Sequence, residues 1–469
     1  MSTAPISQDR ARQGGAGQER ALRVLYIAFY FPPSRASGVY RARATANYFA
    51  DRGWDVTTIA APMSFLNNLT DSLDEQLQST VDPRIKIERV DFHGFAFNRD
   101  IRDFSVFRRN TPVAAARLHK WSNHHVFPEA YASWGWAVAR HAIRLHARER
   151  FDLVVATGNP FASFAAAWVI NRMTGVPYAI DYRDSWTLDL FNDGPAFEKG
   201  HIAWRWERRI IKRASMVTFV NEALRGWHAD RYPDAAHKLM VVPNGWDPEL
   251  MQAATVGDGD VPSDVDHPLR FAYFGTVTQS QPIEELVAAF DIAREHPELA
   301  DAELNIHGHL GFFKGGNLSI LSRLGLSDES DAAPHVEGIH YRGPVSKLEV
   351  ASVYERSDVL VFLAGGARYV TSGKIFEYMA TGKPIVSVHE PGIAATEVLA
   401  GYPLWFSADS LNPDAVAQAM IGAGKAARDI TPELRAAGRA HAAAYTRQAV
   451  LAPYEERLRA IASKRRRRS

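Results

Sequence analysis

Short apolar segments alternate with amphipathic helical stretches along most of the chain, from residue 24 onward. In the first half they predict strands at residues 24–29, 55–60, 85–90, 153–157, 178–180, 217–220 and 238–242. A second series follows at residues 269–275, 304–307, 340–342, 359–363 and 385–388. Alternation of this kind is typical of parallel sheets covered by crossover helices. The pattern therefore predicts an α/β protein with two doubly wound, Rossmann-like sheets.

The periodic pattern is interrupted between the two series of strands. The segment GDGDVPSDVDHP, residues 257–268, is rich in Asp, Gly and Pro and indicates a linker. We expect a first domain at residues 22–245, a hinge at 246–268 and a second domain at 269–428. Residues 429–463 are rich in Ala and Arg and are expected to form one or two closing helices. A length of 469 residues also favours two hydrophobic cores over one.

Both ends of the chain are polar. Residues 1–21 lack the apolar stretch of a secretory signal and predict a disordered leader, so we expect a cytoplasmic protein. The most apolar run, residues 161–170, is about half the roughly 20 residues that a membrane-spanning helix needs. The basic tail at 464–469 can contact anionic lipid or remain a solvated terminus, and both interpretations stay open.

Composition excludes several classes of site. The chain has no cysteine, which rules out disulfides, thiolate metal ligands and a cysteine nucleophile. A net charge of +1 with 23% charged residues gives no reason to expect a nucleic-acid partner.

A glycine-containing turn follows the first predicted strand. Gly38 lies at the entrance of the next helix, and Arg41 lies one turn further on. A glycine here lets a ligand approach the backbone, and the first-turn amides suit a phosphate or a sugar hydroxyl. The alternative is that Gly38 serves only the tight turn that any doubly wound domain needs.

The segment SGKIFEYMATGKPIV, residues 372–386, predicts a short helix that ends at Gly382 and precedes a buried strand. Lys374 lies in the first turn, where a cation opposes the helix dipole unless a bound anion compensates. Glu377 faces the same side and can accept hydrogen bonds from a ribose diol. The alternative is a solvated pair worth a few tenths of a kcal/mol. We favour a ligand site.

Several segments in a fixed order extend this interpretation. Gly38 and Arg41 form a Gly-x-x-Arg opening, PNGWD at 243–247 precedes the hinge, and FGT at 274–276 follows the first strand of the second domain. Together with FEYMATGKPIV they resemble the retaining glycosyltransferase family 4, which has the GT-B fold, over residues 22–458. The resemblance implies two domains facing a cleft, with the donor nucleotide mainly on the second domain.

The resemblance also implies roles for single residues. Glu377 matches the glutamate that holds the ribose. The expected donor-binding set around it is Gly38, Asn244, Gly275, Thr276, Ser372, Gly373 and Ile375. Lys374, Glu377 and Arg41 are the expected catalytic residues, with Lys374 and Arg41 stabilising charge on the departing phosphate.

The chain departs from the family pattern at two places. Tyr369 stands where the family has a second glutamate, and no Arg or Lys follows the glycine turn at Gly275. A subset that acts in bacterial surface-polysaccharide assembly has instead a Ser-x-Lys-x-x-Glu-Tyr pattern, which Ser372 to Tyr378 match. Lys374, with Arg368, is the expected substitute for the missing cations.

The same subset resembles this chain at AIDYRDSW, which follows a buried strand of the first domain. Asp181, Arg183, Asp184 and Trp186 are expected to contact the acceptor or the donor sugar, because ligands bind at the carboxyl ends of parallel strands. The alternative for Arg183 and Asp184 is a structural ion pair.

The resemblance implies retaining transfer of a hexosyl or N-acetylhexosaminyl group from a nucleotide-diphosphate sugar, expected to be a UDP-sugar. The acceptor would be a glycan or a lipid-linked molecule in cell-surface polysaccharide synthesis. No cofactor or catalytic metal is expected. Asp258 and Asp260 form an Asp-x-Asp pair, but they lie in the hinge with no strand before them.

Two segments remain ambiguous. The basic helix at 197–215 can lie on a membrane or pack its tryptophans against the sheet. His124 and His125 can line the acceptor side or be structural, and we favour the structural role. Two rival functions are a GT-B nucleotide-sugar epimerase and a non-catalytic GT-B binding module.

Overall fold

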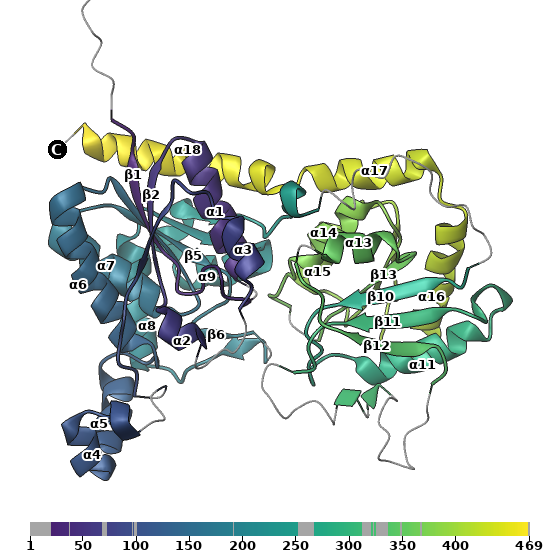
Figure 1. Ribbon diagram of the computed structural model, residues 1–469, viewed down its shortest axis with the longest axis horizontal. Coiled ribbons are helices and arrows are strands. Elements are labelled where there is room, and N and C mark those ends of the chain that lie inside the picture. Colours follow the sequence, from purple (N-terminus) through teal and green to yellow (C-terminus); the bar gives the residue numbers. More distant parts are fainter. Residues whose placement is uncertain are drawn as a thin grey trace, which may run out of the picture.

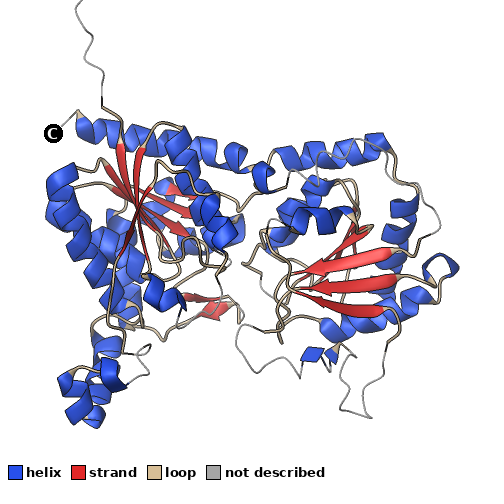
Figure 2. Ribbon diagram, viewed as in Figure 1, coloured by secondary structure: helices blue, strands red, loops and turns tan. Residues whose placement is uncertain are grey.

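The computed structural model consists of two α/β domains side by side, joined along one side by two C-terminal helices (Figure 1). It describes residues 20–36, 38–67, 73–95, 97, 101–190, 192–251, 267–311, 320–321, 323–324, 336–347, 349–365 and 368–467. Within these residues each domain has one parallel sheet with helices around it (Figure 2).

The sheet of the first domain has the strand order β3-β2-β1-β4-β5-β8-β9, and every neighbouring pair is parallel. Its strands are β1 (Arg23–Ile27), β2 (Asp55–Ala60), β3 (Lys86–Arg89), β4 (Leu153–Thr157), β5 (Tyr178–Tyr182), β8 (Met216–Phe219) and β9 (Leu239–Val241). A small hairpin, β6 (Leu188–Asp189) with β7 (Gly194–Pro195), follows β5. All seven predicted strands of this domain are present, with shifts of one or two residues at their ends.

The second sheet has the order β12-β11-β10-β13-β14-β15 and is also parallel. Its strands are β10 (Arg270–Phe274), β11 (Glu303–His307), β12 (Ile339–Gly343), β13 (Val359–Leu363), β14 (Ile385–Val388) and β15 (Trp405–Ser407). The sequence pattern missed β15 because it is a three-residue edge strand that is only partly buried. The predicted class, two doubly wound parallel sheets, is confirmed.

Helices connect the strands as crossovers. Those of the first domain are α1 (Val39–Asp51), α2 (Met63–Phe65), α3 (Glu75–Ser79), α4 (Val106–Asn110), α5 (Pro112–His125), α6 (Ala132–Glu149), α7 (Ala162–Thr174), α8 (Ile202–Arg213) and α9 (Glu222–Arg231). Those of the second are α11 (Ile283–Arg294), α13 (Val350–Glu355), α14 (Lys374–Thr381), α15 (Ala394–Leu399) and α16 (Pro413–Arg428). Gly382 ends α14 with φ of 70°, as its position in the sequence predicts.

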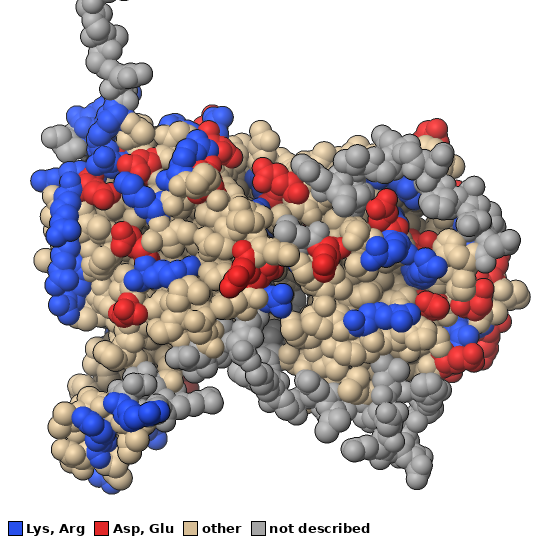
Figure 3. Space-filling view, viewed as in Figure 1, with Lys and Arg blue, Asp and Glu red and all other residues tan. Residues whose placement is uncertain are grey.

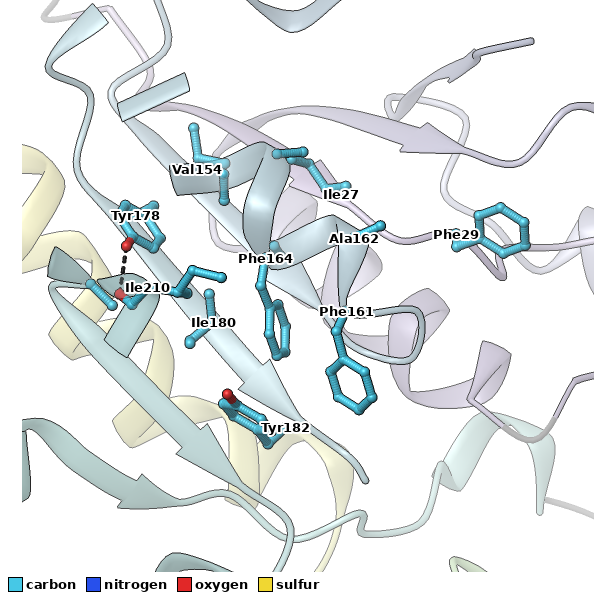
Figure 4. Packing of buried hydrophobic residues seen from close by; sticks show 14 of the residues in the cluster. Ile27, Phe29, Val154, Phe161, Ala162, Phe164, Tyr178, Ile180, Tyr182 and Ile210 are labelled. Carbon is cyan, nitrogen blue, oxygen red and sulfur yellow. Dashed lines mark hydrogen bonds between the residues drawn. The ribbon is translucent and has the colours of Figure 1, made fainter. Parts of the chain in front are cut away.

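The core of the first domain is rich in aromatic side chains. Phe161 and Phe164, at the start of α7, lie close to Tyr182 of β5, and the ring centroids of Phe164 and Tyr182 are 4.7 Å apart (Figure 4). Tyr178 is also buried, and its hydroxyl donates to the carbonyl of Ile210 at 2.6 Å. Because buried hydroxyls need partners, this bond fixes α8 against β5.

Two helices close the structure, as expected for residues 429–463. α17 (Pro432–Ala443) packs on α14 of the second domain, and α18 (Arg447–Arg466) returns to pack on α1 of the first (Figure 1). The helix α18 extends beyond the predicted boundary at residue 463, so the first part of the expected basic tail is helical. Within the described part of the chain, no helix combines the length and apolar character needed to cross a bilayer.

Candidate active site

The two domains meet where the loop before α14 contacts the first domain. The amide of Asn221 donates to the carbonyl of Tyr369 at 2.7 Å and to the hydroxyl of Thr371 at 3.0 Å. The amide of Asn244 donates to the carbonyl of Thr371, also at 3.0 Å. Asn244 therefore holds the loop that leads into the expected donor site, a role that the sequence did not reveal.

Tyr369 shows what replaces the family's second glutamate. Its side chain is 7% exposed and belongs to the hydrophobic cluster of the first domain, although the residue belongs to the second. Its neighbour Arg368 reaches Asp193 of the first domain at 3.6 Å. Tyr369 therefore contributes to the contact between the two domains, and Arg368 forms an ion pair with Asp193 at the surface.

The N-terminus of α14 has the arrangement that the sequence predicts. Lys374 is the first helical residue, and its backbone amide donates to the hydroxyl of Ser372 at 3.3 Å. A side chain at Gly373 would meet no atom within 4 Å, so the helix entrance is open. Ile375 is fully buried and can offer a ligand only its backbone. Amides of a first helical turn lack intrahelical acceptors and suit an anion.

The turn after β10 lies beside this helix entrance. Gly275 has φ of 148°, and a Cβ there would lie 3.7 Å from Cε of Lys374. Gly308 packs directly against this turn. A Cβ on Gly308 would lie 1.8 Å from the carbonyl oxygen of Gly275, so a side chain there would displace the turn. The carbonyl of Thr276 accepts a bond from the hydroxyl of Tyr273 at 3.1 Å. Gly275 and Lys374 are thus brought together as expected.

The carboxylate of Glu377 is held on both oxygens. The ammonium of Lys347 donates to Oε1, and the hydroxyl of Tyr354 donates to Oε2 at 2.8 Å. Burial raises the pKa of Glu377, but the charges of Lys347 and Lys374 outweigh it, and the pKa lies below its usual value. The ammonium of Lys347 also lies 5.1 Å from the centre of the Tyr40 ring of the first domain.

Burial acts in the opposite sense on Lys374. Burial lowers the pKa of this ammonium to about 8. The negative charge of Glu377 raises the pKa, whereas the positive charge of Lys347 lowers it further. An ammonium that is short of negative partners suits an anionic ligand. Among the described residues Glu377 forms its ion pair with Lys347, and Lys374 acts on it through its charge. The three residues together form a charged triad at the start of α14.

A small cavity adjoins the triad and is lined by Tyr40, Gly245, Trp246, Asp247, Leu250, Met251, Lys347, Glu377 and Arg447. Asp247 of the PNGWD segment pairs with Arg43. In the described residues, the buried Nε and Nη1 atoms of Arg447 have no hydrogen-bond partner. Burial lowers the pKa of Arg447 to about 10. The cavity thus carries unneutralised positive charge beside Glu377.

Arg41 requires a correction. Its side chain is 3% exposed, and Nε and Nη2 donate to the two oxygens of Asp181 at 2.9 and 2.7 Å. The remaining Nη1 donates to the carbonyl of Pro243 at 2.8 Å. Asp181 also accepts bonds from Thr157 and Thr218, at 3.2 and 2.7 Å. Arg41 and Asp181 therefore form an internal ion pair, and the predictions that they face the phosphate and the sugar are wrong.

The half-buried Arg183 of the AIDYRDSW segment is bound to the backbone of the first domain. Arg183 donates to the carbonyls of Gly158 and Asn159, and a Cβ on Gly38 would lie 1.2 Å from its Nη1. Gly38 is thus required to make room for Arg183. Both Arg183 and Asp184 are described, and no ion pair joins them, so that alternative is wrong as well.

Trp186 does not offer a free stacking face. Its ring is stacked on Phe161 at a centroid distance of 5.6 Å and is 5% exposed. The prediction that it contacts a sugar is therefore wrong. The half-buried Asp184 is the remaining polar candidate of this segment.

The base of α5 borders a shallow surface cavity, wide open to solvent and of about 580 Å³, lined by Lys120, Asn123, His124, Pro128, Glu129, Ala130, Phe197 and His201. His124 and His125 are both exposed, so the structural role favoured for them is wrong. Glu129 accepts backbone bonds at the start of α7, and burial raises its pKa to about 8. This cavity is a candidate for the acceptor side of the first domain.

The basic helix near residues 197–215 is α8. Ala203, Ile210 and Ile211 are buried, and Trp206 donates its indole N–H to the carbonyl of Val126 at 2.6 Å. Packing against the domain therefore accounts for its apolar residues. Asp258 and Asp260 lie outside the described residues, among which no three His, Asp or Glu side chains are grouped to hold a metal ion.

Sequence reasoning missed Lys347, Tyr354 and Arg447. Lys347 and Tyr354 belong to a loop and a helix about thirty and twenty residues before Glu377, and no local spacing relates them to it. Arg447 comes from α18, which crosses between the domains.

Comparison with known proteins agrees with this arrangement. The first domain matches a family model described as glycosyl transferase 4-like domain over residues 38–245, and the second matches glycosyl transferases group 1 over residues 268–423. No protein among the curated sequences matches the chain.

Solved structures share the whole architecture. A glycosyltransferase from Rickettsia africae ESF-5 has a TM-score of 0.63 and 12% identity, covering 94% of this chain and 99% of its own. Sucrose-phosphate synthase from Thermosynechococcus elongatus has a TM-score of 0.62 and 15% identity, covering 94% and 100%. HepE from Anabaena in complex with UDP-glucose has a TM-score of 0.59 and 14% identity, covering 94% and 100%. At these identities the likeness establishes the fold.

The two matched domains, in this order and with this architecture, define a glycosyltransferase with the GT-B fold. The chain belongs to the glycosyl transferase 4-like family.

Proposed function

We propose that the protein is a retaining glycosyltransferase that uses a UDP-sugar and acts in the synthesis of a cell-surface polysaccharide or glycoconjugate. The observation that carries the proposal is the position of Lys374. This lysine stands at the first turn of α14, directly after the open helix entrance at Gly373 and beside the turn at Gly275, one turn before Glu377. Amides, an ammonium and a carboxylate in this order suit a diphosphate followed by a ribose.

The diphosphate would lie across the N-terminus of α14. There the first-turn amides and Lys374 stabilise the negative charge that develops on the leaving phosphate, which is the main task of the protein in such a transfer. Cations from the protein supply this charge in our proposal, and neither a metal ion nor another cofactor is required. Arg447, whose buried Nε and Nη1 have no hydrogen-bond partner among the residues that the structure describes, adds to the positive potential of the small cavity beside Glu377.

The ribose would bind at Glu377. Each carboxylate oxygen carries two acceptor sites, so the bonds from Lys347 and Tyr354 leave one on each oxygen for a ribose hydroxyl. Uridine as the base is favoured by the similar structures of HepE, which hold UDP and UDP-glucose. The sugar transferred is proposed to be a hexose or an N-acetylhexosamine.

The acceptor, a glycan or a lipid-linked molecule, would approach from the first domain. Arg41, Asp181 and Trp186 are internal, so acceptor contacts must come from other groups, and the cavity at the base of α5 offers them. We propose that the enzyme works in the cytoplasm, peripherally at the inner face of the membrane.

Thermal-shift titration with nucleoside diphosphates and nucleotide sugars tests the donor site. Stabilisation grows with the logarithm of ligand excess over the dissociation constant. We expect UDP to stabilise the wild type and to stabilise Glu377→Ala much less. Glu355→Ala, which removes an exposed glutamate at the end of the neighbouring α13, is the matched control and should behave as wild type.

Product analysis separates the rival functions. An epimerase would change the donor sugar with no acceptor present, whereas a transferase would at most hydrolyse it slowly. Absence of stabilisation by any nucleotide would favour a non-catalytic binding module. An inverted anomeric centre in the product would refute the retaining mechanism.

A further inference from the structure

Two helices of the first domain stand away from its body. The pair α4 and α5, with the residues that flank it, spans 101–126 and projects from the lower end of the first domain as an arm (Figure 1). No residue of α4 is buried, and Ala115 is the buried residue of α5. Because α4 and α5 neither fill a core nor cover a sheet, packing within the domain does not explain their apolar residues.

The arm carries large apolar side chains in solvent. Seven of the ten exposed large hydrophobic residues in the described part of the chain lie at 101–126: Ile101, Val106, Phe107, Val113, Leu118, Trp121 and Val126. Phe107 is 50% exposed and Trp121 is 54% exposed. Single exposed hydrophobics are common on protein surfaces, but a concentration of them marks an interaction surface.

The charge of the arm is predominantly positive. Residues 101–126 contain Arg102, Arg108, Arg109, Arg117 and Lys120, and Asp103 is the single acidic residue. Arg117 stands between Val113 and Trp121 at helical spacing, so cations and apolar groups alternate along one face of α5. Figure 3 shows Lys and Arg spread over this projection among residues that carry no full charge.

A neighbouring helix extends this positive surface. Trp136, Arg140, Arg144 and Arg148 of α6 recur at every fourth residue and are exposed. Figure 3 shows a column of Lys and Arg along the edge where Figure 1 places α6. The exposed arginines of α6 therefore extend the positive charge of the arm along the same edge of the first domain.

We propose that the arm at 101–126 binds the surface of a membrane that contains anionic lipid, with Phe107 and Trp121 inserted at the headgroup level. Aromatic residues prefer this interface, and basic residues nearby are attracted by anionic headgroups. The inference rests on the proposed function for its biological sense, since a membrane-bound acceptor requires an enzyme at the membrane.

A lipid surface explains the arm better than a second copy of the chain. Pairing two arms would bring their arginines together, and like charges across an interface are unfavourable. The base of the arm borders the cavity lined by His124, Phe197 and His201. Docking therefore brings the lipid surface to the same side of the first domain as the candidate acceptor cavity.

Flotation of the full-length protein with vesicles tests the proposal. Vesicles of phosphatidylcholine mixed with phosphatidylglycerol should carry the wild type upward, and vesicles of phosphatidylcholine alone should not. The variant Phe107→Ser/Trp121→Ser should lose about tenfold or more in partitioning, and so should Arg109→Glu/Arg117→Glu. Met173→Ser is the matched control, because Met173 is 70% exposed but lies at the C-terminal end of α7.

The outcomes discriminate clearly. A wild type that stays in the soluble fraction with anionic vesicles overturns the proposal, as do arm variants that float like the wild type. A dimer in sedimentation that the arm variants convert to monomer would assign the surface to a second copy instead. Stabilisation by UDP, measured on the same proteins, should be unchanged in all variants, so failure of lipid binding is distinguishable from failure of the donor site.

Discussion

Lys347 and Glu377 form an ion pair in the wall of the small cavity beside α14, from a loop and a helix that are thirty residues apart in the sequence. The carboxylate that the family resemblance assigns to the ribose is thus already held in one orientation before any nucleotide binds. Tyr354 completes the arrangement from the other oxygen at 2.8 Å.

Removal of the Lys347 ammonium should affect both stability and binding. We expect Lys347→Met to lower the free energy of unfolding by about 1–3 kcal/mol, since it leaves a partly buried carboxylate short of a partner. UDP should bind more weakly because Glu377 loses its fixed orientation, and Lys347→Arg should retain most of both properties. Denaturant unfolding and calorimetric titration measure the two effects.

A double-mutant cycle of Lys347→Met with Glu377→Gln isolates the pair. Residues in contact give non-additive changes in the free energy of unfolding, whereas independent residues add within about 0.3–0.5 kcal/mol. Additivity within that limit would contradict a direct interaction between the two side chains.

The affinity for UDP should depend on pH through Lys374. Burial lowers the pKa of this ammonium to about 8, so the free protein loses the charge above that pH. A bound diphosphate favours the protonated form, so binding above pH 8 must take up a proton. We expect the dissociation constant to rise by no more than about twofold between pH 7 and 8 and by up to about tenfold per pH unit well above pH 8. Lys374→Arg should remove this dependence, and a flat profile in the wild type would contradict it.

Arg41 should matter for folding and not for the donor. Arg41→Met leaves Asp181 buried without its cation, and breaking such a pair costs about 3–5 kcal/mol. The double variant Arg41→Met/Asp181→Leu should recover part of this loss. Urea unfolding measures the free energy of unfolding of the single and of the double variant. Full stability of Arg41→Met together with lost UDP affinity would show that the arginine faces the ligand after all.

Restoring the family's residue at Tyr369 should separate the domains. Tyr369→Glu places a carboxylate inside the hydrophobic cluster of the first domain, where an ionised group is strongly disfavoured. We expect a larger radius of gyration in small-angle scattering, together with a lower free energy of unfolding. Tyr369→Phe keeps the packing and should resemble the wild type. An unchanged radius of gyration in Tyr369→Glu would contradict the contact.

The strands and the donor helix were predictable because their signals are local. Strand β13 and the stop of α14 at Gly382 follow from an apolar run and from a glycine with positive φ, and each depends on a few neighbouring residues. The juxtaposition of Gly275 and Lys374 followed from the resemblance, and the geometry agrees with it.

The first-domain site was not predictable in the same way. The polar residues of AIDYRDSW end a buried strand, and that position is shared by residues that face a ligand and by residues that face the core. Which of the two holds for Asp181 depends on Arg41, a residue 140 positions away in the chain. Lys347 and Arg447 escaped notice because isolated cations in loops and helix starts have no distinguishing pattern.

The return of α18 to the first domain has a consequence for synthesis. Val450, Leu451, Tyr454 and Leu458 belong to the same hydrophobic cluster as the strands β1 and β2, which are among the first parts of the chain to be made. The indole of Trp54 likewise donates to Glu455 at 2.7 Å. The same cluster includes Ala42, Ala46 and Phe49 of α1, so this face of the N-terminal sheet is covered in part as soon as α1 forms. The part that α18 covers gains its apolar partners only when the C-terminal residues have been made, so the first domain is completed last although its strands are made first.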